Sequence, residues 1–209
     1  MKRVFIAALL TLAFSFTIQT QSAAQQTDTL VSPGAISVRA TSVSELRAWD
    51  TFVTEGDRSG TLRLRSVQRD PLLPARTVER FDQFHQGVRI WGADIVRDSE
   101  RGVPHSIFGM LSPTLTLSVE PSLTGSAARE ALLLTGGTEA SLLTEPELVI
   151  LRLDSGDHRL TYTAVVSGGG DVIRAFIDAQ TGAELKRYSE IQTQQAAVGT
   201  GTGVLGDLK

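Results

Sequence analysis

The first regular pattern of apolar and polar positions along the chain has the period of a helix. Ser42 and Glu45 have the spacing of a capping box, in which each side chain accepts a hydrogen bond from a free backbone N–H of the first turn. Apolar side chains then recur at Val43, Leu46, Trp49, Phe52 and Val53. Gly56 and Gly60 end the pattern. The sequence therefore predicts an amphipathic helix with a single apolar face.

From Leu62 onward apolar and polar positions alternate, which is typical of half-buried strands. Asp70-Pro71 and Pro74 interrupt the first of these strands. Three further strands are expected at residues 77–86, 88–97 and 103–111. Turn sequences at residues 86–87 and 98–102 connect them, and connections this short imply antiparallel neighbours.

A second unit with the same order of elements follows a proline-flanked linker at residues 113–121. Its helix is expected at residues 126–134, with Gly136 and Gly137 as the stop signal. Four strands are expected after it, at residues 148–153, 160–166, 172–178 and 184–191. The turns between them, at residues 154–157, 167–170 and 179–182, are rich in Asp and Gly and favour hairpins.

Together these patterns predict an α+β protein with two small antiparallel-sheet units. One unit covers residues 42–112 and the other residues 122–191, and each has a helix that covers one face of its sheet. Residues 25–41 are rich in Gln, Thr, Ser, Pro and Gly and are expected to form a flexible leader. Residues 192–209, rich in Gln, Ala and Gly, are expected to form a second flexible stretch.

The N-terminal 24 residues have the pattern of a secretory signal peptide. Lys2 and Arg3 precede an apolar run, and Ser22-Ala23-Ala24 provides the small residues that a signal peptidase requires. The apolar run of about 15 residues is shorter than the roughly 20 that span a bilayer. We therefore expect a secreted or extracytoplasmic protein with no membrane contact after signal removal.

Composition narrows the possible chemistry. The chain has no cysteine, which excludes disulfides, thiolate metal sites and a cysteine nucleophile. Without residues 1–24 it carries 18 Lys and Arg against 23 Asp and Glu, a formal charge of −5. A mildly acidic exported protein lacks the basic surface of a nucleic-acid-binding protein, so nucleic acid is not expected as a partner.

The candidate chemical motifs are incomplete. His85, His105 and His158 are far apart and no H-E-x-x-H zinc motif is present. Residues 201–206 match the G-x-G-x-x-G dinucleotide motif, but no strand precedes them and no helix follows. Four aspartates that could suggest calcium fall at predicted turns, where Asp is common: Asp154, Asp157, Asp171 and Asp178. Arg63, Arg65 and Arg69 alternate along a strand and are interpreted as a solvated face. We expect no catalytic residue, cofactor or metal site in this chain.

Three stretches resemble one family. Residues 80–93 (RFDQFHQGVRIWGA) resemble the core of the fungalysin/thermolysin propeptide domain, and residues 176–186 (FIDAQTGAELK) the closing hairpin of a PepSY domain. Residues 199–209 (GTGTGVLGDLK) are similar to the start of mature thermolysin-like enzymes. The residues that carry the first two likenesses are Arg80, Phe81, Gln83, Gly87, Val88, Ile90, Trp91, Gly92, Ala93, Asp178, Thr181 and Gly182.

The resemblance implies the signal peptide and propeptide of a zinc metalloendopeptidase precursor, ending before any catalytic residue. Residues 42–112 would be the fungalysin/thermolysin propeptide domain, residues 122–191 the PepSY domain, and residues 192–209 the processing segment and the start of the mature enzyme. Such a propeptide assists folding of the protease domain in cis and inhibits it until cleavage, for which Ala196-Ala197 is the expected junction. Zinc and calcium are expected only in the protease domain.

Two alternatives remain open from the sequence. The chain could be a stand-alone exported inhibitor or binding module of the same fold, or an enzyme with an unrecognised site. The reading frame after Lys209 distinguishes the precursor from the stand-alone module, because a precursor continues into H-E-x-x-H and a stand-alone module stops. Casein hydrolysis by residues 25–209 alone would support the enzyme with an unrecognised site.

Overall fold

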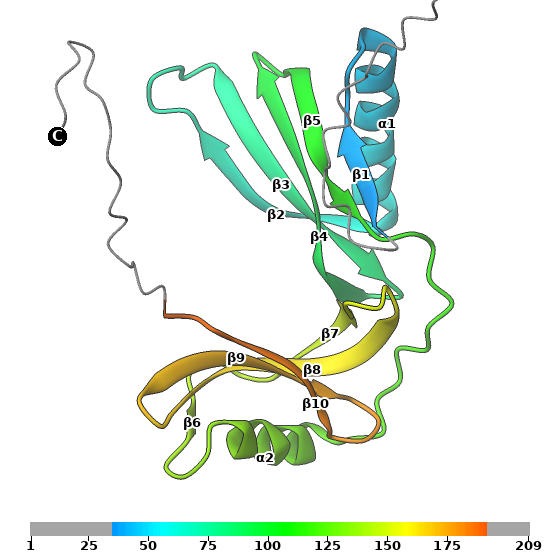
Figure 1. Ribbon diagram of the computed structural model, residues 1–209. Coiled ribbons are helices and arrows are strands. Elements are labelled where there is room, and N and C mark those ends of the chain that lie inside the picture. The colour runs from blue at the N-terminus through cyan, green and yellow to red at the C-terminus, as the bar shows by residue number, and fades with distance from the viewer. Residues whose placement is uncertain (1–34, 192–209) are drawn as a thin grey trace, which may run out of the picture. The chain divides into compact units, whose positions relative to one another are not determined.

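The computed structural model describes residues 35–191, which contain two helices and ten strands (Figure 1). The predicted signal peptide, most of the predicted leader and residues 192–209 lie outside the described residues. The strands form one sheet in the order β1-β5-β4-β7-β8-β9-β10, with β2 attached through β3 and β6 through β8. All pairings but one are antiparallel. The predicted α+β class is confirmed.

The first helix, α1 (Val43–Ser59), begins and ends at the predicted signals. The hydroxyl of Ser42 accepts a hydrogen bond from the Glu45 backbone N–H at 3.2 Å. The Glu45 carboxylate accepts from the Thr41 N–H at 2.7 Å, one residue before the donor expected in a capping box. Gly60 ends the helix in the left-handed region, at φ 78°. None of the helices among residues 35–191 is long and apolar enough to cross a membrane.

Five strands lie with α1 in the first half of the structure. They are β1 (Ile36–Arg39), β2 (Leu62–Arg69), β3 (Arg76–His85), β4 (Val88–Glu100) and β5 (Val103–Leu111). Helix α1 and all five strands contribute buried side chains to one apolar cluster, the first core. Its members are Val38, Val53, Leu62, Phe81, Ile95, Ile107 and Leu111. The helix thus covers one face of this part of the sheet, as predicted.

Two predicted boundaries in the first half were wrong, that of the leader and that of the turn after β4. Residues 36–39 are not part of a leader, because β1 pairs with β5 and buries Val38 in the first core. A four-residue strand after a Pro- and Gly-containing segment gives little periodicity, so the sequence pattern missed it. The turn predicted at residues 98–102 is shorter than expected, since β4 continues to Glu100 and Asp98 pairs with Ser106.

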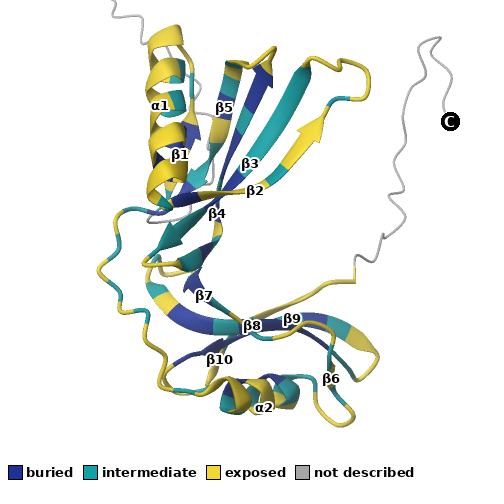
Figure 2. Cartoon of the chain, turned by 180° about the vertical axis from the view of Figure 1, so that it is seen from behind, coloured by how far each residue is buried: buried dark blue, intermediate teal, exposed yellow. Residues whose placement is uncertain are grey.

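The second half repeats the arrangement of helix and sheet. Helix α2 (Gly125–Thr135) is capped by Thr124 and packs Ala128 and Leu132 against the sheet. The strands are β6 (Ser141–Leu142), β7 (Glu147–Arg152), β8 (His158–Gly168), β9 (Asp171–Asp178) and β10 (Glu184–Ser189). Figure 2 shows the buried residues concentrated on β8 and β9 and the outer side of α2 exposed. The two-residue strand β6 was not predicted.

Strand β4 belongs to both halves, so the two predicted units share one sheet. Its first residues pair in parallel with β7, Arg89 with Val149 and Ile90 with Ile150. Strand β3 pairs with both parts of β4, at Val88 and Arg89 and again from Asp94, whereas β5 pairs with β4 only from Asp94 onward. Gly92 lies between the two parts with φ 75°, a conformation that glycine adopts without steric cost. The bend at Gly92 lets one strand serve two regions of the sheet.

Candidate functional site

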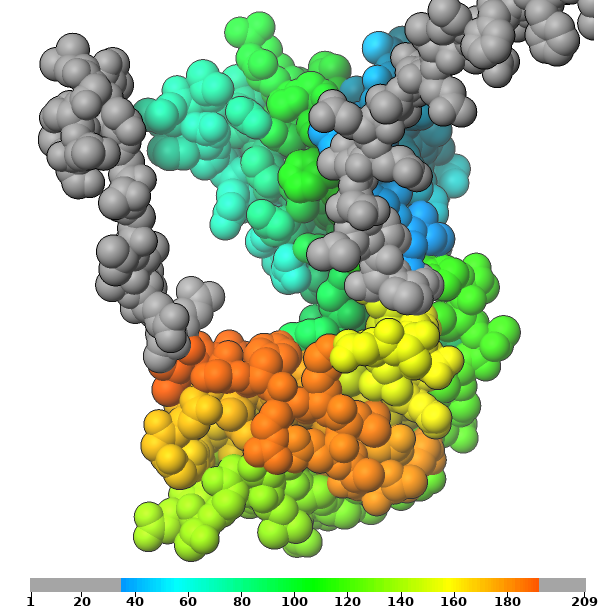
Figure 3. Space-filling model, viewed as in Figure 1, coloured from blue at the N-terminus to red at the C-terminus, as the bar shows by residue number. Residues whose placement is uncertain are grey.

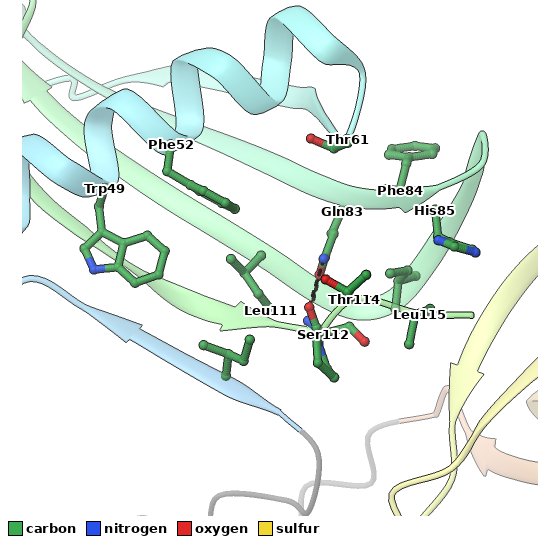
Figure 4. Close-up of a pocket in the computed structure, with 13 residues that line it drawn as sticks. Trp49, Phe52, Thr61, Gln83, Phe84, His85, Leu111, Ser112, Thr114 and Leu115 are labelled. Carbon is green, nitrogen blue, oxygen red and sulfur yellow. Dashed lines mark hydrogen bonds between the residues drawn. The ribbon is translucent and has the colours of Figure 1, made fainter. Parts of the chain in front are cut away.

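The first family-like stretch forms the β3–β4 hairpin. Phe81 is buried in the first core, whereas Arg80 is half-buried. Gly87, at φ 84°, follows Gln86 in the tight turn. Gln83 reaches the end of β5, where its amide donates to the Ser112 carbonyl at 3.0 Å and accepts from the Ser112 N–H at 2.7 Å (Figure 4). The hairpin therefore fixes the point at which the chain leaves the first half.

The two family-like stretches meet in one apolar cluster. The buried members of this joint cluster are Ile90, Ala93, Ile150, Leu160 and Ala179, with Val88 partly buried against them. Ala179 belongs to the β9–β10 turn, which Asp178 holds by accepting from the N–H groups of Gln180 and Thr181 at 2.7 and 3.0 Å. Gly182 completes the turn at φ 76°. Both stretches thus contribute to the contact between the halves.

An apolar pocket of about 420 Å³ lies between α1, β3 and the segment after β5 (Figure 4). Trp49 and Phe52 of α1 point toward it. Two of its polar side chains are bound to backbone groups: Gln83 binds Ser112, and His85 Nε2 lies 3.0 Å from the Leu117 carbonyl oxygen. With these groups occupied, the pocket suits apolar contacts and offers little for chemistry.

Ser112 and His158 form the one contact in residues 35–191 that resembles a nucleophile and its base. Ser112 Oγ lies 2.8 Å from His158 Nε2. Ser112 is only 6% exposed, however, and no carboxylate binds the other nitrogen of the ring among the described contacts. Burial lowers the pKa of His158, and the charge of Arg152 lowers it further against the opposing charge of Asp157. We therefore interpret this contact as a structural link between β8 and the end of β5.

Six charged side chains line a second cavity, of about 480 Å³, which we call the junction groove. Its lining residues come from both halves and are Arg65, Asp82, Arg89, Trp91, Thr144, Glu145, Glu147, Thr163 and Arg174. Arg65 bridges two carboxylates, Asp82 at 2.8 Å and Asp94 at 3.1 Å. The groove presents paired charges of both signs rather than a single charge.

Two arginines of the groove stack on Trp91. The guanidinium carbons of Arg89 and Arg174 lie 4.7 and 4.9 Å from the centre of the Trp91 ring, within the range of cation–π attraction. Arg89 also makes a bidentate pair with Glu147, at 2.7 and 2.9 Å. Trp91 in turn packs edge-on against Phe176, with ring centres 5.1 Å apart. This family-like residue therefore joins β4 to β9.

The ionisation of the groove residues follows from burial and pairing. Burial raises the pKa of Asp82, and the charges of Arg65 and Arg89 oppose the shift. Burial disfavours the charge of Arg89, but the hydrogen bond and charge of Glu147 outweigh it and raise the pKa of Arg89. Charged side chains that are partly desolvated and already oriented are suited to recognition of a polar partner.

The other candidate residues lie apart from one another. His105 pairs with Asp98 at 3.2 Å, Asp154 with Lys186 at 2.8 Å, and Asp171 accepts from Ser189 at 2.9 Å. Within residues 35–191 no group of three or more His, Cys, Asp or Glu side chains is placed to hold a metal ion. Ala196 and Ala197, the expected processing residues, lie outside the described residues.

Sequence reasoning described only part of the groove. Arg63, Arg65 and Arg69 are exposed, as predicted, but the sequence did not indicate that Arg65 binds two carboxylates or that Arg63 lies 4.1 Å from the centre of the Phe84 ring. The bulge between Leu64 and Ser66 turns Arg65 toward Asp82, and a bulge leaves no signal in the alternating pattern. Glu147 was missed because its partner Arg89 is 58 residues away.

The chain resembles part of a known protease. It is 27% identical over 186 residues to the thermostable neutral protease NprT of Geobacillus stearothermophilus, a match that covers 76% of this chain and 33% of that protein. The chain therefore spans about a third of the length of this relative. No family model matches it. Among solved structures, the Bacillus megaterium YpeB C-terminal domain is 19% identical, with 74% of this chain and 67% of that chain covered, and the TM-score of 0.41 is too low to establish a shared fold.

Proposed function

We propose that this chain is the propeptide of a secreted thermolysin-like metalloendopeptidase precursor, which assists folding of the protease, inhibits it and is removed by cleavage. The observation that carries the proposal is the match to a neutral protease, which takes up most of this chain and a third of that protein. A match of this extent is what a propeptide gives when it is compared with a whole precursor.

The chaperone role follows from linkage. A partner that binds only the folded protease stabilises that state by mass action. When the partner is part of the same polypeptide, its effective concentration is in the millimolar range for a short flexible connection. The described residues supply a folded body with four apolar clusters between its elements, so it can act as a preformed template for the protease domain.

The inhibitory role requires a surface that recognises the protease. The junction groove is the best candidate, because Arg65 and Glu147 keep side-chain exposures of 45% and 47% although both are paired. Groups of this kind can exchange their present partners for groups of an incoming surface at small cost. Cleavage at Ala196-Ala197 would then separate the inhibitor from the enzyme.

The test adds the full chain in trans to a thermolysin-like neutral protease. We expect slower casein hydrolysis and a higher yield of active protease when the two are refolded together. Arg89→Ala should weaken inhibition at least about tenfold, the effect of losing a half-buried charge pair at an interface. Arg97→Ala, which breaks an equally buried pair with Glu79 outside the groove, is the matched control and should leave inhibition unchanged. Unchanged hydrolysis and unchanged refolding yield with the wild-type chain would contradict the proposal.

A further inference from the structure

The last strand of the described chain is held on one side only. Strand β10 pairs with β9 and with no other described strand, and it lies on the molecular surface (Figure 3). Its pairing is irregular between Glu184 and Lys186. Terminal edge strands open more easily than the central strands of a sheet. The contacts at the end of β10 therefore determine the C-terminal boundary of the folded part of the described chain.

A set of contacts at Glu190 fastens this end to β9. The Glu190 N–H donates to the Val172 carbonyl at 2.7 Å, and its carboxylate accepts from Arg174 Nε at 2.6 Å. The Ser189 hydroxyl donates to Asp171 at 2.9 Å. Each of these contacts joins the end of β10 to a residue of β9, so together they close the hairpin at its open end.

The arginine that binds Glu190 is itself held in place. The guanidinium of Arg174 stacks on Trp91, and its side chain is 21% exposed against 35% for Glu190. Tyr188 lies within the same group, with its ring centre 5.9 Å from that of Phe176. A stacked and half-buried guanidinium loses less rotamer freedom on pairing than a free one. The Arg174–Glu190 pair is thus better positioned than an ordinary surface pair.

Another ion pair of β10 lies within the strand. Arg187 and Glu184 are both on β10, with Nε and Oε1 2.5 Å apart. Because both partners belong to the same strand, the loss of Glu184 does not detach β10 from β9. Glu184 therefore provides a matched control for Glu190.

We propose that Arg174, seated on Trp91, clamps Glu190 and so sets the C-terminal limit of the body that remains after proteolytic processing. In this role Arg174 is a positioning residue for the cleavage named in the proposed function, on which the inference rests. A protease binds its substrate as an extended segment, so a paired strand must open before it is cut. While the clamp is closed, cleavage takes place beyond Ile191 and β10 stays with the body.

The experiment treats the full chain with a limiting amount of a thermolysin-like neutral protease and identifies the retained fragments by intact-mass spectrometry. The wild type and Glu184→Gln should give bodies that end at or beyond Ile191. Glu190→Gln and Arg174→Gln should give bodies that end within residues 184–190, formed about five to ten times faster, because cleavage tracks the population of the open strand. Hydrogen exchange of the β10 amides should rise in the same two variants while α1 keeps its protection.

Repeating the digestion with a subtilisin-type serine protease separates this inference from the proposed function. Strand opening is a property of the substrate, so the same shift of the boundary is expected whichever protease cuts. If the wild-type chain fails to inhibit the neutral protease but the boundary still shifts, the clamp stands and the proposed function fails. Identical end points in wild type and Glu190→Gln, or an equal shift in Glu184→Gln, would overturn the clamp.

Discussion

The two halves share a design, a helix on one face of an antiparallel sheet, but differ on the opposite face. In the first half, Phe81 faces α1 whereas the next residue, Asp82, faces away and binds Arg65. In the second half, Ala175 packs toward α2 whereas the next residue, Phe176, lies in another apolar cluster with Val149, Leu151 and partly buried Trp91. The second half is therefore buried on both faces of its central strands. The first half keeps one polar face, on which Asp82 and Arg65 are paired.

The largest expected effect comes from removing the two central phenylalanines, Phe81 and Phe176. Both side chains are almost fully buried, so each change to alanine should lower the free energy of unfolding by about 3–5 kcal/mol. Phe176→Ala should also loosen the Trp91 stack, whereas Phe81→Ala should leave it intact. Urea unfolding measures the free energy, and near-UV circular dichroism reports the aromatic packing. A loss below about 1 kcal/mol for Phe176→Ala would contradict burial on both faces.

Gly92→Ala tests how firmly the bend of β4 couples the halves. A Cβ at this position meets no atom within 4 Å, so the cost comes from the positive φ of 75° and should be about 1–2 kcal/mol. Gly125→Ala is the control, because Gly125 also has open space but no positive φ, and it should be neutral. We expect Gly92→Ala to unfold in one transition at lower urea. Two separate transitions already present in the wild type would show that the halves are independent.

The caps of the two helices should contribute equally, although α1 is longer than α2. Ser42 and Thr124 each accept a hydrogen bond from a first-turn N–H, at 3.2 and 3.3 Å. Ser42→Ala and Thr124→Ala should each cost about 1 kcal/mol, measured by urea unfolding. Ser44→Ala removes a hydroxyl that contacts Ser42 but caps no backbone group, and should have little effect. A much larger cost for Ser42 would indicate that the first half depends more strongly on its helix.

The smallest effect concerns the link between β8 and the end of β5. Because burial holds the pKa of His158 below 6.5, the folded protein binds fewer protons there than the unfolded chain. The stability that this residue contributes is complete above pH 6.5 and is lost as the pH falls toward the folded pKa. Between about pH 7.5 and 5.5 the urea midpoint of the wild type should therefore fall more than that of His158→Gln. His105→Gln is the control. An equal fall of the urea midpoint in wild type and His158→Gln would refute the contribution of the Ser112–His158 contact.

Local signals predicted most of the fold. The period of apolar residues located α1 and the long strands. Gly60 marked the end of α1, and Gly87 marked the turn between β3 and β4. These features could be predicted because they depend on neighbours in the sequence. The pairing of β4 with β7 was not predicted, since it involves two residue pairs separated by about 60 positions of intervening chain. A contact so short and so distant produces no periodicity.

The candidate site was predicted only in part for the same reason. Trp91 and Gly92 were singled out by the resemblance, and both lie where β4 passes from one half to the other. Arg174, which stacks on Trp91, and Glu147, which pairs with Arg89, come from strands far along the chain, and neither has a distinctive local sequence. Which charges surround Trp91 is a property of the tertiary structure alone.

Because both halves share β4, the order of the strands along the chain favours folding of the first half before the second. All strands of the first half, including β4, precede Ser112 in the chain, whereas β7 starts only at Glu147. A polypeptide that emerges N-terminus first can complete α1 and its five strands while the edge of β4 at Arg89 and Ile90 waits unpaired. The later strands then dock onto that edge, and the joint cluster closes last, when Ala179 arrives. The first half can therefore fold first and provide the strand edge onto which the second half docks.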